Sequence, residues 1–194
     1  MQLWLNSMRI KIFTMKPGVL LLFWVFFSVS VCGQQYQPVD DGSAVKFSIK
    51  NFGVNVNGDF KGLQGTIRFN PSELSTAFFN VTIDANTINT GINARDNHLR
   101  KEDYFNVLKY PVISFIAKKV VPTDKRESYI VTADIIIKGI SRAVSFPFNA
   151  FLQNDGWLFT GEFKLNRKDF KVGKSSFILS DNLAVSLSVV AKRK

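Results

Sequence analysis

From Tyr36 onward, hydrophobic and polar residues alternate with a period of two, which is the pattern of half-buried β-strands. In residues 45–50 (VKFSIK), for example, valine, phenylalanine and isoleucine fall on one face, and lysine and serine on the other. The alternation recurs in seven further segments: residues 66–69, 79–84, 113–118, 131–138, 144–148, 157–165 and 183–189. We therefore expect about eight strands, with most phenylalanines on their inward faces.

Short segments rich in glycine, asparagine, aspartate and proline separate the strands. They are residues 57–58 (NG), 70–71 (NP), 122–124 (PTD), 138–139 (KG) and 154–156 (NDG). Asn-Gly and Asp-Gly supply the positive φ angles that tight hairpins need. No shift in composition marks a second domain, so the pattern predicts one all-β domain, closed as a sandwich or as a barrel.

One polar segment, residues 89–106 (NTGINARDNHLRKEDYFN), lacks the alternation. Thr90 is a suitable helix N-cap, so we expect a short helix within residues 90–104. Asp96 would then lie on the solvent side of this helix and Ile92 on the inner side. Such a helix would lie across a barrel end, or on its flank, and link two strands.

The first 33 residues have the organisation of a secretory signal peptide. Basic residues precede an apolar run at residues 19–27 (VLLLFWVFF), and small residues follow it. The run is shorter than the roughly 20 apolar residues of a membrane span, which argues against an uncleaved anchor. We expect cleavage after Gly33, which makes residues 1–33 a signal peptide and residues 34–194 a periplasmic or secreted domain.

Cys32 is the only cysteine and allows lipoprotein processing as an alternative. We favour cleavage after Gly33, because lipoprotein processing needs a small residue where this chain has Val31. The mature domain would then hold no cysteine, which excludes a disulfide framework, a cysteine zinc site and a thiol nucleophile.

The charge balance is basic. The whole chain carries 25 Lys and Arg against 15 Asp and Glu, and removal of the three basic residues before Gly33 changes the net charge from +10 to +7. This excess would favour an anionic membrane surface or a lipid phosphate. We expect no nucleic-acid partner, since an exported protein seldom meets one, and the pattern specifies no oligomeric state.

The candidate chemistry is sparse. The chain has one histidine, His98, and contains no GxSxG, no HExxH and no glycine-rich phosphate loop after a strand. We therefore expect neither an enzyme nor a protein with a metal ion or cofactor.

The chain contains 19 phenylalanines, most of them outside the first 33 residues, and these either fill the interior or line a cavity. An eight-stranded barrel is just wide enough to be filled by its own side chains or to hold one small ligand. Small inward residues at Ala117, Ala133 and Gly161 would leave room for a ligand. The expected lining residues are Phe47, Phe69, Phe79, Phe115, Ile135, Phe146, Phe163 and Val185.

Several segments together resemble the YceI-like, polyisoprenoid-binding family. They are residues 88–115 (INTGINARDNHLRKEDYFNVLKYPVISF), 58–70 (GDFKGLQGTIRFN), 129–148 (YIVTADIIIKGISRAVSFPF), 165–173 (LNRKDFKVG) and 181–193 (DNLAVSLSVVAKR). The resemblance extends from about Tyr36 to Arg193. It implies an eight-stranded antiparallel lipocalin-like β-barrel, exported to the periplasm, that holds a polyprenyl phosphate or an isoprenoid quinone in an apolar tunnel.

The polar candidates fall into two groups. Residues that could meet a lipid head group are Arg95, His98, Arg100 and Lys138, the last at a position where the family often has histidine. Residues that look structural are Asp96, Arg167 and Asp169, and we expect an ion pair between Asp96 and Arg167 across a barrel end. A lone histidine on a polar helix is also a common surface residue.

Two functions remain open at this stage. The first is an exported carrier with an isoprenoid lipid in its interior. The alternative is a non-enzymatic envelope interaction module with a packed barrel and a basic exterior. A continuous apolar void would favour the carrier, and a filled interior would favour the module.

Overall fold

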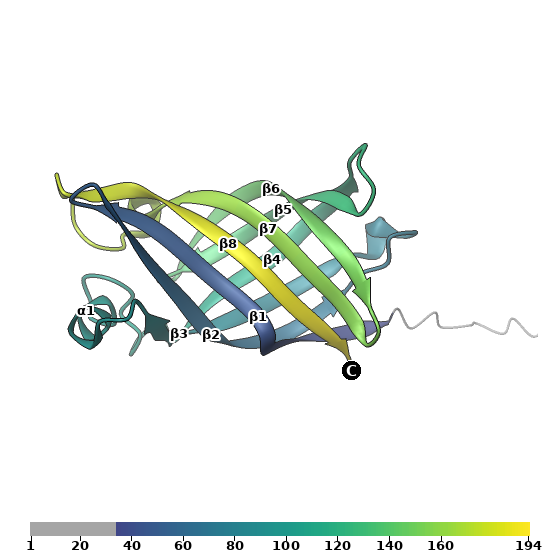
Figure 1. Cartoon of the computed structure of the whole chain (residues 1–194), viewed down its shortest axis with the longest axis horizontal. Helices are drawn as coiled ribbons and strands as arrows, with labels where there is room; N and C mark the ends of the chain where they lie inside the picture. The colour runs from purple at the N-terminus through teal and green to yellow at the C-terminus, as the bar shows by residue number, and fades with distance from the viewer. Residues whose placement is uncertain (1–33) are drawn as a thin grey trace, which may run out of the picture. The chain divides into compact units, whose positions relative to one another are not determined.

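Eight antiparallel strands close into a barrel in the computed structural model, which describes residues 34–194 (Figure 1). Each strand pairs with the next along the chain, and β8 pairs with β1. The strands are β1 (Gln35–Asn51), β2 (Val54–Arg68), β3 (Phe78–Asn89), β4 (Val112–Pro122), β5 (Ser128–Ile137), β6 (Ile140–Gln153), β7 (Gly156–Asn166) and β8 (Leu179–Arg193). The predicted eight-stranded barrel is confirmed, whereas the predicted signal peptide lies outside the described residues.

The β1–β2 hairpin turns at Phe52 and Gly53, with φ angles of 51° and 76°. The prediction of a turn at residues 57–58 is wrong. Gly58 lies within β2 opposite Phe47, whose ring covers it so closely that a Cβ there would lie 2.4 Å from the ring. The Asn-Gly pair therefore lies inside a strand, where Gly58 allows close packing with Phe47, and the chain turns five residues earlier. The predicted turn at residues 138–139 is confirmed.

Three short helical segments lie in the connections: η1 (Leu74–Thr76), α1 (Asn93–Leu99) and η2 (Arg167–Phe170). In the described part of the chain, no helix is long and apolar enough to cross a membrane. Since α1 lies between β3 and β4 and within residues 90–104, the predicted helix in this connection is confirmed.

Details of the α1 prediction are wrong. The N-cap residue is Ile92, which is exposed, whereas Asp96 is buried with only 4% of its surface exposed. The Asp96 carboxylate turns back and accepts hydrogen bonds from the backbone N–H and the hydroxyl of Thr90. Asp96 thus fastens the start of the helix to the end of β3, which is why it faces inward.

The connections alternate between the two ends of the barrel, as an up-and-down topology requires (Figure 1). One end, called here the α1 end, carries the β1–β2 hairpin, the β3–β4 connection with α1, the β5–β6 hairpin and the β7–β8 connection with η2. The opposite end, called the aromatic end, carries the other three connections and the C-terminus.

A cluster of aromatic rings fills the aromatic end. Phe69 lies at its centre, with ring centroids 5.1 to 6.2 Å from those of five other rings, most of them edge to face. These five are Phe79, Tyr129, Phe148, Trp157 and Phe159, each at most 9% exposed. Edge-to-face pairs of rings contribute stability in addition to that gained by burying their apolar surface. This cluster, called here the aromatic plug, therefore closes this end of the barrel.

Candidate ligand-binding cavity

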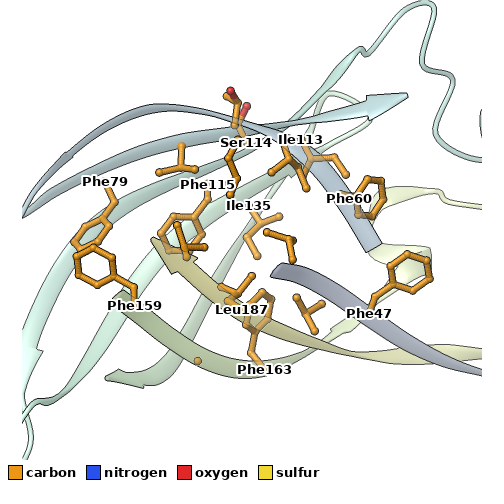
Figure 2. A pocket seen from close by; sticks show the side chains of 18 of the residues that line it. Phe47, Phe60, Phe79, Ile113, Ser114, Phe115, Ile135, Phe159, Phe163 and Leu187 are labelled. Atoms are coloured by element: carbon orange, nitrogen blue, oxygen red, sulfur yellow. The ribbon is translucent and has the colours of Figure 1, made fainter. Parts of the chain in front are cut away.

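Between the aromatic plug and the α1 end lies a cavity of about 190 Å³. Side chains from all eight strands border it, and its wall is almost wholly hydrocarbon. In Figure 2 the lining residues Phe79 and Phe159 lie on one side of the cavity, Phe47 and Phe60 on the other, and Phe115, Ile135, Phe163 and Leu187 between them. Ser114 borders the cavity but points away from these rings (Figure 2).

The cavity exists because side chains near the barrel axis do not fill the interior. Phe115 and Phe163 pack against both buried hydrophobic clusters of the barrel, one that contains the aromatic plug and one formed by Ile135, Ile137, Phe170 and Val172. Both rings keep part of their surface exposed because they face the void. Gly161 borders the cavity and leaves space where Phe159 and Phe163, its neighbours on the same face of β7, place rings. Of the two alanines also expected to leave room, Ala133 belongs to the packed core and Ala117 packs against that core.

Seven of the eight predicted lining residues border the cavity: Phe47, Phe79, Phe115, Ile135, Phe146, Phe163 and Val185. The eighth, Phe69, does not, because it follows the last residue of β2 and lies inside the aromatic plug. That the seven touch a ligand stays a prediction.

Reasoning from alternation missed Phe60 and Leu63, which also line the cavity. In β2 the pairing register shifts twice around residues 59–64, and Gly62 and Gly65 there have φ angles of 78° and 129°. These bulges change which residues face inward, so a strict period of two fails. The two glycines were the available signal.

The aromatic rings nearest the α1 end are less buried than those of the plug. Phe60 lies 5.7 Å from Phe47 and 5.6 Å from Phe105, measured between ring centroids. All three are half-buried, whereas Phe79, Phe148 and Phe159 are buried. A ligand longer than the cavity would therefore extend toward the α1 end.

The arginines predicted to meet a head group lie outside the cavity wall and brace the β3–β4 connection. Arg95 donates to the hydroxyl and carbonyl oxygens of Thr90, both at 2.7 Å. Arg100 donates to the carbonyl oxygens of Asn86 and Ile88 in β3, at 2.8 and 3.0 Å. Their observed contacts are therefore structural.

The other two head-group candidates also lie outside the cavity wall. His98 is exposed on α1, with its ring edge-on to Tyr104 at 4.8 Å. Lys138 is half-buried at the β5–β6 turn and donates from Nζ to the carbonyl oxygen of Lys171 at 3.0 Å. Both lie at the α1 end, so a head group placed outside the barrel at this end would be near them.

Arg167 is buried, as its presumed structural role requires, but the expected ion pair with Asp96 is wrong. The guanidinium pairs with Asp181 at 2.8 Å, and it also donates to the backbone carbonyls of Val172, Lys174 and Ser180 at 2.9 to 3.0 Å. The Asp96 carboxylate is bound by Thr90 in the β3–β4 connection, whereas Arg167 pairs with Asp181 at the start of β8. Asp169, in the same motif, is exposed.

Among residues 34–194, no group of three or more His, Cys, Asp or Glu side chains is arranged to hold a metal ion. What the cavity itself offers is hydrocarbon surface, which binds an apolar molecule by removing it from water.

A closed eight-stranded antiparallel barrel with an apolar interior cavity is the architecture of the lipocalin-like class of proteins. Within that class, the chain belongs to the YceI-like domain family, whose model matches residues 36–191. The family resemblance inferred from the sequence motifs is thereby confirmed.

Individual relatives agree with this assignment. Protein YceI of Salmonella arizonae is 27% identical over 181 residues, which cover 89% of this chain and 94% of the relative. The crystal structure of the Campylobacter jejuni YCEI protein has a TM-score of 0.64 and 29% identity, covering 73% of this chain and 86% of that one.

Two more distant structures share the fold. Burkholderia cenocepacia BcnA has a TM-score of 0.71 and 23% identity, covering 76% of this chain and 94% of its own. A polyisoprenoid binding domain from Saccharophagus degradans, implicated in plant cell wall breakdown, has a TM-score of 0.66 and 17% identity, covering 82% and 98%.

Proposed function

We propose that this protein binds a long isoprenoid lipid, a polyprenyl phosphate or an isoprenoid quinone, with the tail in the barrel and the head group at the α1 end. The observation that carries the proposal is the apolar cavity bordered by all eight strands. The Saccharophagus degradans relative, a polyisoprenoid binding domain of the same fold, supports the choice of lipid. The protein acts by holding this lipid and not by converting it.

The cavity is large enough for such binding to be favourable. An apolar cavity of about 150 Å³ in another protein stays dry and binds benzene, and the cavity here is larger. Each buried methylene contributes about 0.8 kcal/mol before the costs of association, so one five-carbon isoprene unit contributes about 4 kcal/mol. Few polar contacts are then needed, which agrees with the apolar wall.

The direction of the tail follows from the two ends. The plug around Phe69 closes the aromatic end, whereas Phe47, Phe60 and Phe105 at the α1 end are half-buried. The terminal isoprene units would therefore lie against the plug. The head group would emerge near Lys138 and the lysines of the β7–β8 connection.

The same proposal includes export. Its support is the order of basic, apolar and small residues before Gly33, after which the barrel sequence begins. Amino-terminal sequencing of protein purified from an envelope or periplasmic fraction would test it. A chain that starts at Gln34 supports cleavage, and a chain that keeps residues 1–33 in the cytoplasmic fraction contradicts it.

The cavity favours the carrier over the packed interaction module. The test is expression of the full chain with its amino-terminal segment, purification, extraction with organic solvent, and mass spectrometry of the extract. We expect an isoprenoid at about one molecule per protein. A clean extract, together with no uptake of added polyprenol by the delipidated protein, would overturn the proposal.

A further inference from the structure

Exposed hydrophobic side chains gather at the α1 end of the barrel. Ten large hydrophobic residues are exposed among residues 34–194, and seven of them lie in connections or strand ends at this end. Phe177 is fully exposed, Leu108 is 98% exposed and Phe52 is 72% exposed, so Phe177 and Phe52 are the most exposed aromatic residues. The Phe52 backbone N–H donates to the carbonyl oxygen of Ile178 at 2.8 Å, so the two loop tips lie side by side.

Phe52 holds its exposed position in an unfavourable backbone conformation. Its φ of 51° lies in the left-handed region, where a bulky side chain is rare and asparagine is preferred. A phenylalanine ring directed into water recovers little of this cost through packing within the barrel. The ring is therefore better explained by a partner outside the barrel.

The connections at the two ends differ in the sign of their net charge. The connections at the α1 end carry nine Lys and Arg against four Asp and Glu, whereas those at the aromatic end carry two against four. Lys50 beside the β1–β2 hairpin and Lys171 in the β7–β8 connection are both exposed. Exposed aromatic residues with lysines in or beside the same loops are the pattern of proteins that lie on anionic membranes.

The basic charge also argues against a second copy of this chain as the partner. Two α1 ends facing each other would bring like charges together, which costs several kcal/mol. A bilayer with anionic phospholipids supplies both the opposite charge for the lysines and the hydrocarbon for the rings.

We propose that the α1 end docks on the surface of an anionic phospholipid bilayer, with the Phe52 and Phe177 rings inserted below the head groups and Lys50 and Lys171 against the phosphates. The docking rests on this surface alone. Its use for lipid transfer rests on the proposed function, because a tail held with its end against the aromatic plug would enter and leave at the α1 end.

The test is co-sedimentation of the purified protein with vesicles of phosphatidylglycerol and phosphatidylcholine, compared with phosphatidylcholine alone. We expect binding to the mixed vesicles that weakens as salt is raised, since the lysine contribution is screened. The double variant Phe52→Asn with Phe177→Ser should bind at least tenfold more weakly. Asparagine suits the φ angle at position 52, so the hairpin should be retained.

Matched controls separate the two contributions. Phe151→Ser with Leu152→Ser removes two exposed hydrophobic side chains from β6, near the aromatic end, and should leave vesicle binding unchanged. Lys50→Glu with Lys171→Glu should abolish the preference for phosphatidylglycerol. The docking proposal would be overturned if the Phe52/Phe177 and Phe151/Leu152 double variants lost vesicle binding to the same extent. It would also be overturned if binding did not depend on phosphatidylglycerol.

Uptake of polyprenol from detergent solution distinguishes this proposal from the proposed function. Uptake from detergent without vesicle binding would refute docking and leave the carrier function in place. Vesicle binding that depends on Phe52 and Phe177, without any uptake of polyprenol, would support docking and refute the carrier function.

Discussion

Replacement of Gly161 by leucine should fill the cavity without changing the fold. Gly161 lies in β7 between Phe159 and Phe163, borders the cavity and does not have a positive φ angle. A Cβ at this position would lie 3.3 Å from Phe146 and Phe148, which is tight and requires those side chains to move by a few tenths of an ångström. The rest of the new side chain would extend into the void.

The expected loss of affinity follows from the carbon atoms displaced. Leucine adds four carbons to a cavity of about 190 Å³. These four carbons occupy nearly the space of the five-carbon isoprene unit that they exclude. Four ligand carbons contribute between about 0.3 and about 0.8 kcal/mol each. The affinity for a polyprenol should therefore fall by about 1 to 3 kcal/mol, which is roughly fivefold to 150-fold.

The assay is a binding titration of delipidated protein with a polyprenol, together with urea unfolding of each variant. Ala143→Leu is the matched control, because Ala143 is exposed on the outer face of β6. The free energy of unfolding of the Gly161 variant should stay within about 3 kcal/mol of the parent, since overpacking and cavity filling oppose each other. Unchanged affinity in a folded Gly161→Leu protein would refute the location of the tail.

Further predictions concern the wall and the buried charge. Phe163→Asp should abolish retention of the lipid, seen by extraction and mass spectrometry, because a carboxylate would face the hydrocarbon tail, whereas Lys164→Asp, on the opposite face of β7, should not. Phe115→Asp should behave like Phe163→Asp, and full retention in both would show that the lining is assigned wrongly. Arg167→Met should lower the free energy of unfolding in urea by about 3 kcal/mol, because several buried carbonyl oxygens and Asp181 lose their donor. The exposed Asp169→Asn should change it by less than about 0.5 kcal/mol, and equal effects at the two positions would contradict this reading of Arg167.

The sequence by itself determined the strands and most of the inward faces. A period of two encodes directly which side chains share a face, so seven of the eight predicted lining residues border the cavity. The α1 segment was found for the complementary reason, because it lacks that period. These are local signals, and they need no knowledge of which strands pair.

What only the tertiary structure decided depends on contacts between segments distant in sequence. Asn-Gly at residues 57–58 is a turn signal locally, yet the ring of Phe47 packs on Gly58 and places both residues inside a strand. The bulges in β2 turn Phe60 and Leu63 inward, and the pairing of β2 with β3 sets where they occur.

The cavity and the buried charges show the same division. The void is the small difference between the volume enclosed by eight strands and the volume of the side chains inside, and it is defined only once the barrel closes. Likewise, the sequence singled out Asp96 and Arg167, but their partners, Thr90 and Asp181, follow from how each connection folds back on its own strands. Periodicity specifies which face a residue occupies, whereas closure of the barrel decides what that face meets.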